Sequence, residues 1–218
     1  MSDMITTPVT ARTDGAAERE MSSTTGRPKP SVSFVRWAGL GLTAGAAAFA
    51  TTFFVYGVAE TEIASRISDL GGLALQLGLF GLLTVMLRTG ATGTSRIARG
   101  MIRFEFGLLS LATFWSVAHA LVPEEMRGAI WLAVLDVFWP LSMLGMFVIG
   151  IKVAVAGRWT GLLRAWPLVA ESWAIVVLPI MGIFGPTVGG PAAGLHLLLG
   201  YGILGVLLAR MPERTGAV

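Results

Sequence analysis

The chain has 218 residues, of which 54% are hydrophobic and only 13% are charged, and its formal net charge is +3. A water-soluble globular protein carries about 25% charged residues, so the composition excludes that class. The sequence has no cysteine, which excludes disulfide frameworks, cysteine-ligated metal centres and thiol nucleophiles.

The first 33 residues are rich in Ser, Thr, Pro and charged side chains and show no apolar periodicity. A segment of this kind cannot bury enough apolar surface to fold, so we expect residues 1–33 to form a disordered cytoplasmic tail. A secretory signal peptide cleaved within residues 46–50 is the alternative. The long polar lead and the apolar stretch of about 25 residues, longer than an ordinary signal core, argue against it.

Six apolar stretches follow, each long enough to cross about 30 Å of hydrocarbon at about 1.5 Å per helical residue. They cover residues 34–58, 70–87, 104–122, 130–155, 166–184 and 191–209. Because each stretch is continuously apolar rather than alternating, the sequence predicts helices and not a barrel. The predicted fold is all-α, a polytopic bundle of six transmembrane helices over residues 34–209, with a cytoplasmic C-terminal tail at 210–218.

The basic residues lie mostly on one side of the predicted bundle. All but Arg66 and Arg127 of the 16 fall on this side, namely in the N-terminal tail and the first residues of the first span, in the second and fourth connections and the end of the fourth span, or in the C-terminus. The other side carries acids instead, at positions 60, 62, 69, 124 and 125. The positive-inside rule therefore places both termini in the cytoplasm. We expect the membrane to be a bacterial-type inner membrane. The excess of basic residues is explained by this flanking charge, so we expect no nucleic-acid partner.

Small residues recur at four-residue spacing within several spans. The pairs are Gly41 with Gly45, Ala74 with Gly78, and Gly190 with Gly194. Such pairs let helix backbones approach closely, which matters in lipid because the hydrophobic effect does little to hold helices together. We expect these pairs to pack inside the bundle, and a homo-oligomer face is the alternative.

Two prolines, Pro140 and Pro179, lie deep within the fourth and fifth spans. A proline has no N–H to donate to the carbonyl four residues earlier, which here belongs to Asp136 and Ile175. The sequence therefore predicts a kink in each span.

The outer leaflet contains a candidate polar cluster of His119, Asp136, His196 and Ser116. The first three fall within roughly 4 to 9 Å of the outer boundary at 1.5 Å per residue, and Ser116 lies one turn before His119. Because only residues 123–129 join the third and fourth spans, we expect these spans to be antiparallel neighbours and His119 to contact Asp136.

Four roles for this cluster remain open. It can be a structural contact, or the proton or cation site of a small transporter. His119 and His196 can also ligate a metal or a haem iron, although no cofactor is the main expectation. The fourth role is an enzyme with His119 as base and Asp136 as its orienting group. No serine or lysine nucleophile motif and no HExxH motif accompanies this pair.

The cytoplasmic leaflet carries Glu105 and Glu171. Basic residues lie nearby in sequence or on the same side, at positions 103, 152 and 164. We therefore expect Glu105 and Glu171 to form ion pairs at the cytoplasmic boundary, with the long basic side chains reaching out to the interface.

Residues 136–185 contain three short patterns, namely Asp136-x-x-x-Pro140, WPLSMLGM at 139–146, and Gly157-Arg-Trp-x-Gly161. They resemble segments of small uncharacterised six-span bacterial membrane proteins. The resemblance covers under a quarter of the chain and implies no cofactor or residue role. The main functional expectation is therefore a non-enzymatic membrane partner or regulatory subunit. A proton- or ion-coupled transporter and a metal- or haem-binding protein are the alternatives.

Overall fold

The computed structural model describes residues 29–58 and 61–218, and most of the expected N-terminal tail lies outside these ranges. In the described ranges every regular element is a helix and no strand is present, which confirms the all-α prediction. Six helical segments are long and apolar enough to cross a membrane, as predicted from hydropathy. The protein is a multi-pass membrane protein.

The first three spans are single helices, and the last three are interrupted. The first three are α2 (Val32–Tyr56), α3 (Glu62–Thr89) and α4 (Arg96–Leu121). The fourth comprises α5 (Ile130–Asp136) and α6 (Phe138–Ala156), and the fifth comprises α7 (Leu162–Glu171) and α8 (Trp173–Phe184). The sixth comprises α9 (Pro186–Leu197), the π-helical turn η2 (Leu198–Gly202) and α10 (Ile203–Arg210). Two short 3₁₀ turns, η1 (Glu124–Met126) and η3 (Pro212–Thr215), lie outside the spans.

Local sequence explains where several helices begin and end. Ser31, Thr61 and Ser95 precede α2, α3 and α4, and each side-chain oxygen accepts a hydrogen bond from a backbone N–H of the first turn. This is the usual N-cap interaction. Gly90 and Gly157 end α3 and α6 in the left-handed conformation, with φ of 64° and 62°, which favours glycine.

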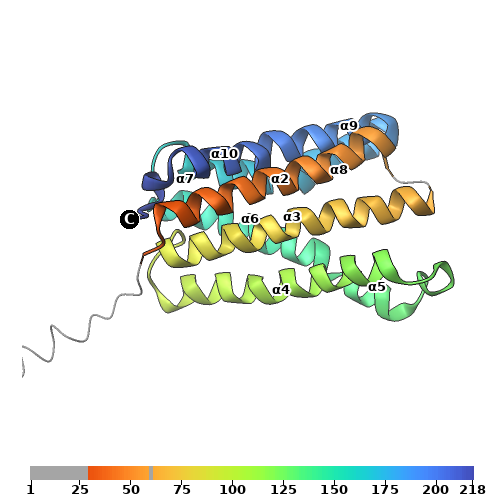
Figure 1. Cartoon of the computed structure of the whole chain (residues 1–218), viewed down its shortest axis with the longest axis horizontal. Helices are drawn as coiled ribbons and strands as arrows, with labels where there is room; N and C mark the ends of the chain where they lie inside the picture. The colour runs from red at the N-terminus through yellow and green to blue at the C-terminus, as the bar shows by residue number, and fades with distance from the viewer. Residues whose placement is uncertain (1–28, 59–60) are drawn as a thin grey trace, which may run out of the picture.

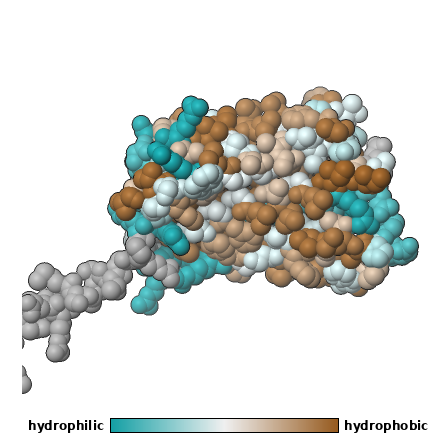
Figure 2. Space-filling view, in the orientation of Figure 1, coloured by the Kyte–Doolittle hydropathy of each residue, from teal (hydrophilic) through white to brown (hydrophobic). Residues whose placement is uncertain are grey.

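The bundle has two distinct ends. The start of α2, the C-terminus and the α3–α4 and α6–α7 turns lie at one end, which we call the terminal end (Figure 1). There Val218 exchanges backbone hydrogen bonds with Pro30 and Val32. The α4–α5 loop and the start of α3 lie at the opposite end. Figure 2 shows hydrophobic residues across the middle of one face and hydrophilic residues at both ends, the distribution expected of a protein embedded in a bilayer.

Glycines allow close packing of α2 against its neighbours. A methyl group added to Gly45 of α2 would overlap the backbone of Ala74 in α3, and one added to Gly205 of α10 would overlap Gly39 and Thr43 of α2. These contacts are the small-residue packing that membrane helices use. Gly41 differs from Gly45, because an added methyl group there would meet nothing within 4 Å.

The breaks in the fourth and fifth spans differ in their relation to the prolines. The fourth span is interrupted at Val137, three residues before Pro140. The fifth is interrupted at Ser172, whose hydroxyl donates to the carbonyl oxygen of Val169 at 2.8 Å. Helix α8 continues through Pro179. The interruption of the fifth span therefore lies seven residues before the proline from which a kink was expected.

Candidate functional site

A cavity of about 90 Å³ lies inside the bundle, and all six spans contribute to its wall. Most of the lining is apolar, and aromatic rings form a continuous part of it. The ring of Phe49 packs against those of Phe53 and Trp139, and Phe53 packs against Trp173, with centroid separations of 5.1 to 6.4 Å. The polar members of the lining are Gln76 from α3, Ser142 from α6 and Tyr201 from η2. The cavity is therefore an aromatic-walled space with a small number of polar groups.

Glu105 of α4 lies next to this cavity and is hydrogen-bonded to Ser142, which lines it. Its side chain is 1% exposed, and the Ser142 hydroxyl donates to Oε1 at 2.6 Å. The second oxygen, Oε2, is buried without a hydrogen-bond partner among the described residues and packs against Gly145 of α6. The absence of a side chain at Gly145 is what allows the Glu105 carboxyl group to fit between α4 and α6.

Glu171 of the fifth span is also buried and also hydrogen-bonded to a single hydroxyl group. It is the last residue of α7 and is 5% exposed, and the Tyr201 hydroxyl donates to its Oε2 at 2.6 Å. Its Oε1 is buried without a partner in the part of the chain that the structure describes. Two carboxyl groups are thus each held by one hydroxyl, and both hydroxyl-bearing residues line the same cavity.

The π-helical turn η2 positions Tyr201. A π turn leaves backbone carbonyls without their usual helical partners, and such turns occur frequently at functional sites. Here the Trp166 indole Nε1 donates to the carbonyl oxygens of Leu199 and Gly200, both at 3.1 Å. Gly200 also lets η2 approach α7, because an added methyl group would stand 2.8 Å from the Cα of Ala170. These contacts bring Tyr201 next to Glu171.

Two further polar groups of the cavity lining have unused hydrogen-bonding capacity. Gln76 is 2% exposed, and its Oε1 has no partner among residues 29–58 and 61–218. The Nε1 of Trp173 is also buried and without a partner there. A buried unpaired polar atom costs about 1 to 3 kcal/mol, so groups of this kind call for an explanation.

The ion pairs expected for Glu105 and Glu171 are replaced by hydroxyl contacts. Among the described residues, ion pairs form only between side chains of α3, α4 and the α4–α5 loop, and none includes either glutamate. The physical reason is the orientation of α4 and α7 about their own axes, which places both glutamates on the side that faces the bundle interior. The basic residues at positions 103 and 164 are exposed.

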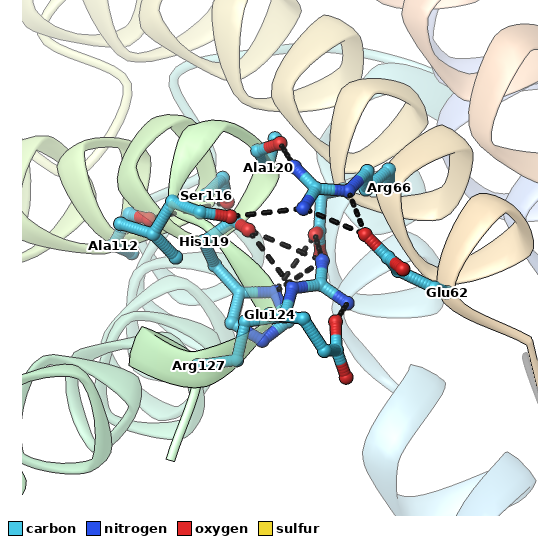
Figure 3. A network of polar contacts seen from close by, with 10 residues as sticks. Glu62, Arg66, Ala112, Ser116, His119, Ala120, Glu124 and Arg127 are labelled. Carbon is cyan, nitrogen blue, oxygen red and sulfur yellow. Dashed lines mark hydrogen bonds and ion pairs between the residues drawn. The ribbon is translucent and has the colours of Figure 1, made fainter. Parts of the chain in front are cut away.

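His119 takes part in a separate polar network at the end opposite the terminal end (Figure 3). Its Nδ1 is hydrogen-bonded to Oδ2 of Asp69 at 2.7 Å, and the same oxygen accepts from Arg127 at 3.3 Å. The ring of Trp115 stacks on the imidazole with a centroid separation of 4.8 Å. The partner of His119 is therefore Asp69 of α3 rather than the expected Asp136.

The two arginines of this end cap the C-terminus of α4. Arg66 donates to the carbonyl oxygens of Ala120 and Val122, the latter at 2.9 Å, and Arg127 donates to that of His119 at 3.1 Å. The last carbonyls of a helix lack intrahelical partners and carry partial negative charge, so arginine side chains stabilise them. The network thus joins α3, α4 and the α4–α5 loop.

The remaining members of the expected outer cluster lie apart from this network. Asp136 ends α5 and is exposed, with no hydrogen bond to a side chain of the described residues. The Nε2 of His196 is hydrogen-bonded to Ser172 at 3.1 Å, and its Nδ1 has no partner there. The hydroxyl of Ser116 donates to the carbonyl oxygen of Ala112 within α4. The structure therefore does not bring these four residues together.

The two histidines have different neighbours, Asp69 for His119 and Ser172 for His196. Over residues 29–58 and 61–218, no three His, Asp or Glu side chains are grouped so that they could hold a metal ion. This arrangement gives no support to a metal or haem iron shared by His119 and His196.

Sequence reasoning singled out both glutamates but missed their partners. Tyr201 is one of only two tyrosines in the chain and lies in an apolar span, which was the available signal for a buried hydroxyl. Ser142 carried no comparable signal, because small polar residues are common in membrane helices.

Comparison of the chain with protein-family models, curated proteins and solved structures finds no match.

Proposed function

We propose that this protein is a small proton-coupled membrane transporter in which Glu105 and Glu171 take up and release protons inside the bundle. The observation that carries the proposal is the pair of buried carboxyl groups, each without a basic partner among the described residues and each hydrogen-bonded to a residue of the same cavity. The site differs from the His119, Asp136 and His196 cluster considered from sequence.

An ionised acid is costly to keep in this position. A carboxylate within a membrane span costs about 2.5 to 3.5 kcal/mol on insertion scales, and such residues typically face the bundle interior and mark ion or proton paths. One hydroxyl contact compensates only part of that cost. Uptake of a proton removes the charge, so a carboxyl group with this environment is suited to cycling between two protonation states.

The orientation belongs to the same proposal. With the terminal end in the cytoplasm of an inner membrane, the Asp69 and His119 network faces outward and the basic residues of the terminal end face inward. The main expectation from sequence, a non-enzymatic partner or regulatory subunit, is the competing function, and it requires no proton movement.

A reconstitution experiment separates the two functions. Purified protein is placed in liposomes that contain a pH-sensitive dye, and a potassium diffusion potential drives proton entry, which in this proposal the two glutamates support even without a cotransported molecule. We expect proton uptake well above that of protein-free liposomes, with loss of the difference in Glu105→Gln and Glu171→Gln. Glu125→Gln, which changes an exposed acid of the α4–α5 loop, should behave like the wild type. Uptake equal to protein-free liposomes would favour the non-enzymatic function.

A further inference from the structure

The first turns of α4 carry three exposed arginines, and we infer that they bind the phosphate group of an anionic phospholipid. Arg96, Arg99 and Arg103 form this α4 arginine cluster. The lipid belongs to the leaflet at the terminal end, where α4 begins (Figure 1). The inference does not rest on the proposed function, because it concerns the outer surface of the bundle and makes no use of Glu105 or Glu171.

Helical geometry places the three arginines on one side of α4. Residues three, four or seven positions apart lie on the same side of a helix, and the cluster has spacings of three and four. At about 100° per residue, Glu105 lies half a turn away from Arg96. Glu105 is buried in the bundle, whereas all three arginines are exposed. The cluster therefore faces away from the other helices and toward lipid.

The charge of the cluster is not balanced by the described part of the protein. None of the three arginines takes part in an ion pair there. The one hydrogen bond that their guanidinium groups make to described residues runs from Arg99 to the carbonyl oxygen of Thr94 at 2.8 Å. A guanidinium group has five N–H donors in a planar fork that matches a phosphate group. Most of the donors of the cluster are thus free to bind an anion.

The position of the cluster along α4 suits a lipid headgroup. Arg103 directly precedes Phe104, where the apolar stretch of this span begins. Figure 2 shows hydrophilic residues at this end of the molecule next to a hydrophobic surface. On the same helix Phe104 is 70% exposed and Phe114 is 57% exposed, and Gly107 between them has open space beside it. A lipid whose phosphate binds the arginines can therefore lay its acyl chains along this apolar part of α4.

Charge decides between a lipid and a second copy of the chain as the group that covers this face. A two-fold dimer brings the same surface patch of both copies together. If both copies are inserted in the same direction, their arginine clusters meet in the same leaflet and repel each other. An anionic phospholipid supplies the opposite charge, and basic residues at the end of a span are a known way to attract one. The charge of the cluster therefore favours the lipid.

Native mass spectrometry of the purified full-length chain in detergent tests the inference. The probe is dioleoylphosphatidylglycerol, and dioleoylphosphatidylcholine, which has the same acyl chains and no net charge, is the control. An arginine near an anionic lipid surface contributes about a fivefold gain in affinity, so we expect the wild type to bind the anionic lipid at least tenfold more tightly. The headgroup alone, glycerophosphoglycerol, should not displace the lipid at equal concentration, because it lacks the acyl chains.

Two triple variants compare the cluster with other basic residues of the terminal end. In the first variant, Arg96→Gln, Arg99→Gln and Arg103→Gln remove the cluster, and the affinity for the anionic lipid should fall at least tenfold. The second variant removes the same charge from exposed arginines of α2, the α6–α7 turn and α10, and should bind as the wild type does. Its substitutions are Arg36→Gln, Arg158→Gln and Arg210→Gln.

Several results would overturn the inference. Equal affinity of the wild type for the two lipids would show that headgroup charge is not recognised, and this comparison holds even if a variant fails to fold. An equal loss in both triple variants would assign the effect to the total charge of the terminal end. Displacement by glycerophosphoglycerol would identify a free phosphate compound as the ligand. A dimer in place of the lipid-bound monomer, lost with the cluster, would identify a second copy.

Discussion

The backbone of Gly145 in α6 lies directly against Oε2 of Glu105 in α4, so closely that an added methyl group would overlap the carboxyl oxygen. The two residues are 40 positions apart and meet beside the internal cavity. Because Gly145 has no side chain, α6 leaves room for the Glu105 carboxyl group. A single methyl group at position 145 would displace that carboxyl group.

Gly145→Ala should therefore displace the Glu105 carboxyl group and lower stability by about 1 to 3 kcal/mol, the usual cost of overpacking. Thermal unfolding of the detergent-purified protein measures the change. Gly107→Ala is the matched control, because a methyl group there meets nothing within 4 Å and alanine favours helix. Equal melting temperatures for both variants would contradict the contact.

Gly45→Ala should separate α2 from α3, since the added methyl group would overlap the backbone of Ala74. Backbone atoms cannot move aside as a flexible side chain can, so we expect a loss of about 1 to 3 kcal/mol. Gly41→Ala, one turn earlier on the same helix, should leave the melting temperature unchanged or raise it slightly. Similar destabilisation by both would indicate that Gly41 also packs against a partner, as in a homo-oligomer.

Tyr201→Phe removes the one hydrogen bond that Glu171 receives from a side chain of the described residues. The buried carboxyl group then has neither oxygen paired there, and we expect a loss of about 1 to 3 kcal/mol together with reduced proton uptake. Tyr56→Phe removes a hydroxyl from a residue that is 41% exposed and serves as the control. A Tyr201→Phe protein with unchanged melting temperature and proton uptake would show that the hydroxyl contact has no role.

Asp69→Asn should destabilise the end of the bundle, because Asp69 accepts from both His119 and Arg127 and its side chain is only 9% exposed. Neutralising Asp69 removes the carboxylate that both His119 and Arg127 contact in a mostly buried network, and we expect a loss on the order of 2 kcal/mol. Asp136→Asn, at an exposed position, should have no measurable effect. The reverse order of the two effects would favour the His119 and Asp136 contact expected from sequence.

Accessibility of introduced cysteines tests the sidedness of the bundle, and the absence of native cysteine makes the labelling specific. Thr94→Cys lies in the α3–α4 turn of the terminal end, and Glu125→Cys lies in the α4–α5 loop. A membrane-impermeant maleimide should label Glu125→Cys in intact cells and Thr94→Cys only after lysis. Labelling of Thr94→Cys in intact cells would invert the proposed orientation.

The spans could be predicted from sequence because hydropathy and length depend only on local composition. The partners of the polar residues could not, because they depend on how each helix is rotated about its axis and which helices are neighbours. His119 illustrates this point. Two acids, Asp69 and Asp136, lie near the same boundary, and loop length favoured Asp136. Helix α5 ends at Asp136 and leaves it on the surface, whereas α3 presents Asp69 to α4.

Glu105 and Glu171 also show that sequence does not fix the partners of polar residues, here because both were expected at the boundary and lie inside the bundle. Their positions near basic residues suggested ion pairs at the boundary, yet α4 and α7 turn them inward. For Glu171 the inward contact depends on the π turn η2, which the sequence does not signal. A purely local reading therefore located these two residues but assigned them the wrong surroundings.

Infrared difference spectroscopy of the purified protein across a pH step tests most directly whether the two buried carboxyl groups bind protons. A protonated carboxyl group has a C=O stretching band that a carboxylate lacks. We expect such a band in the wild type, with one part missing in Glu105→Gln and another in Glu171→Gln. Ser142→Ala should shift the frequency of the Glu105 part, and Tyr201→Phe that of the Glu171 part. If the spectra of Glu105→Gln and Glu171→Gln both show the same carboxyl bands as the wild type, the two glutamates do not bind protons and the proposed function is contradicted.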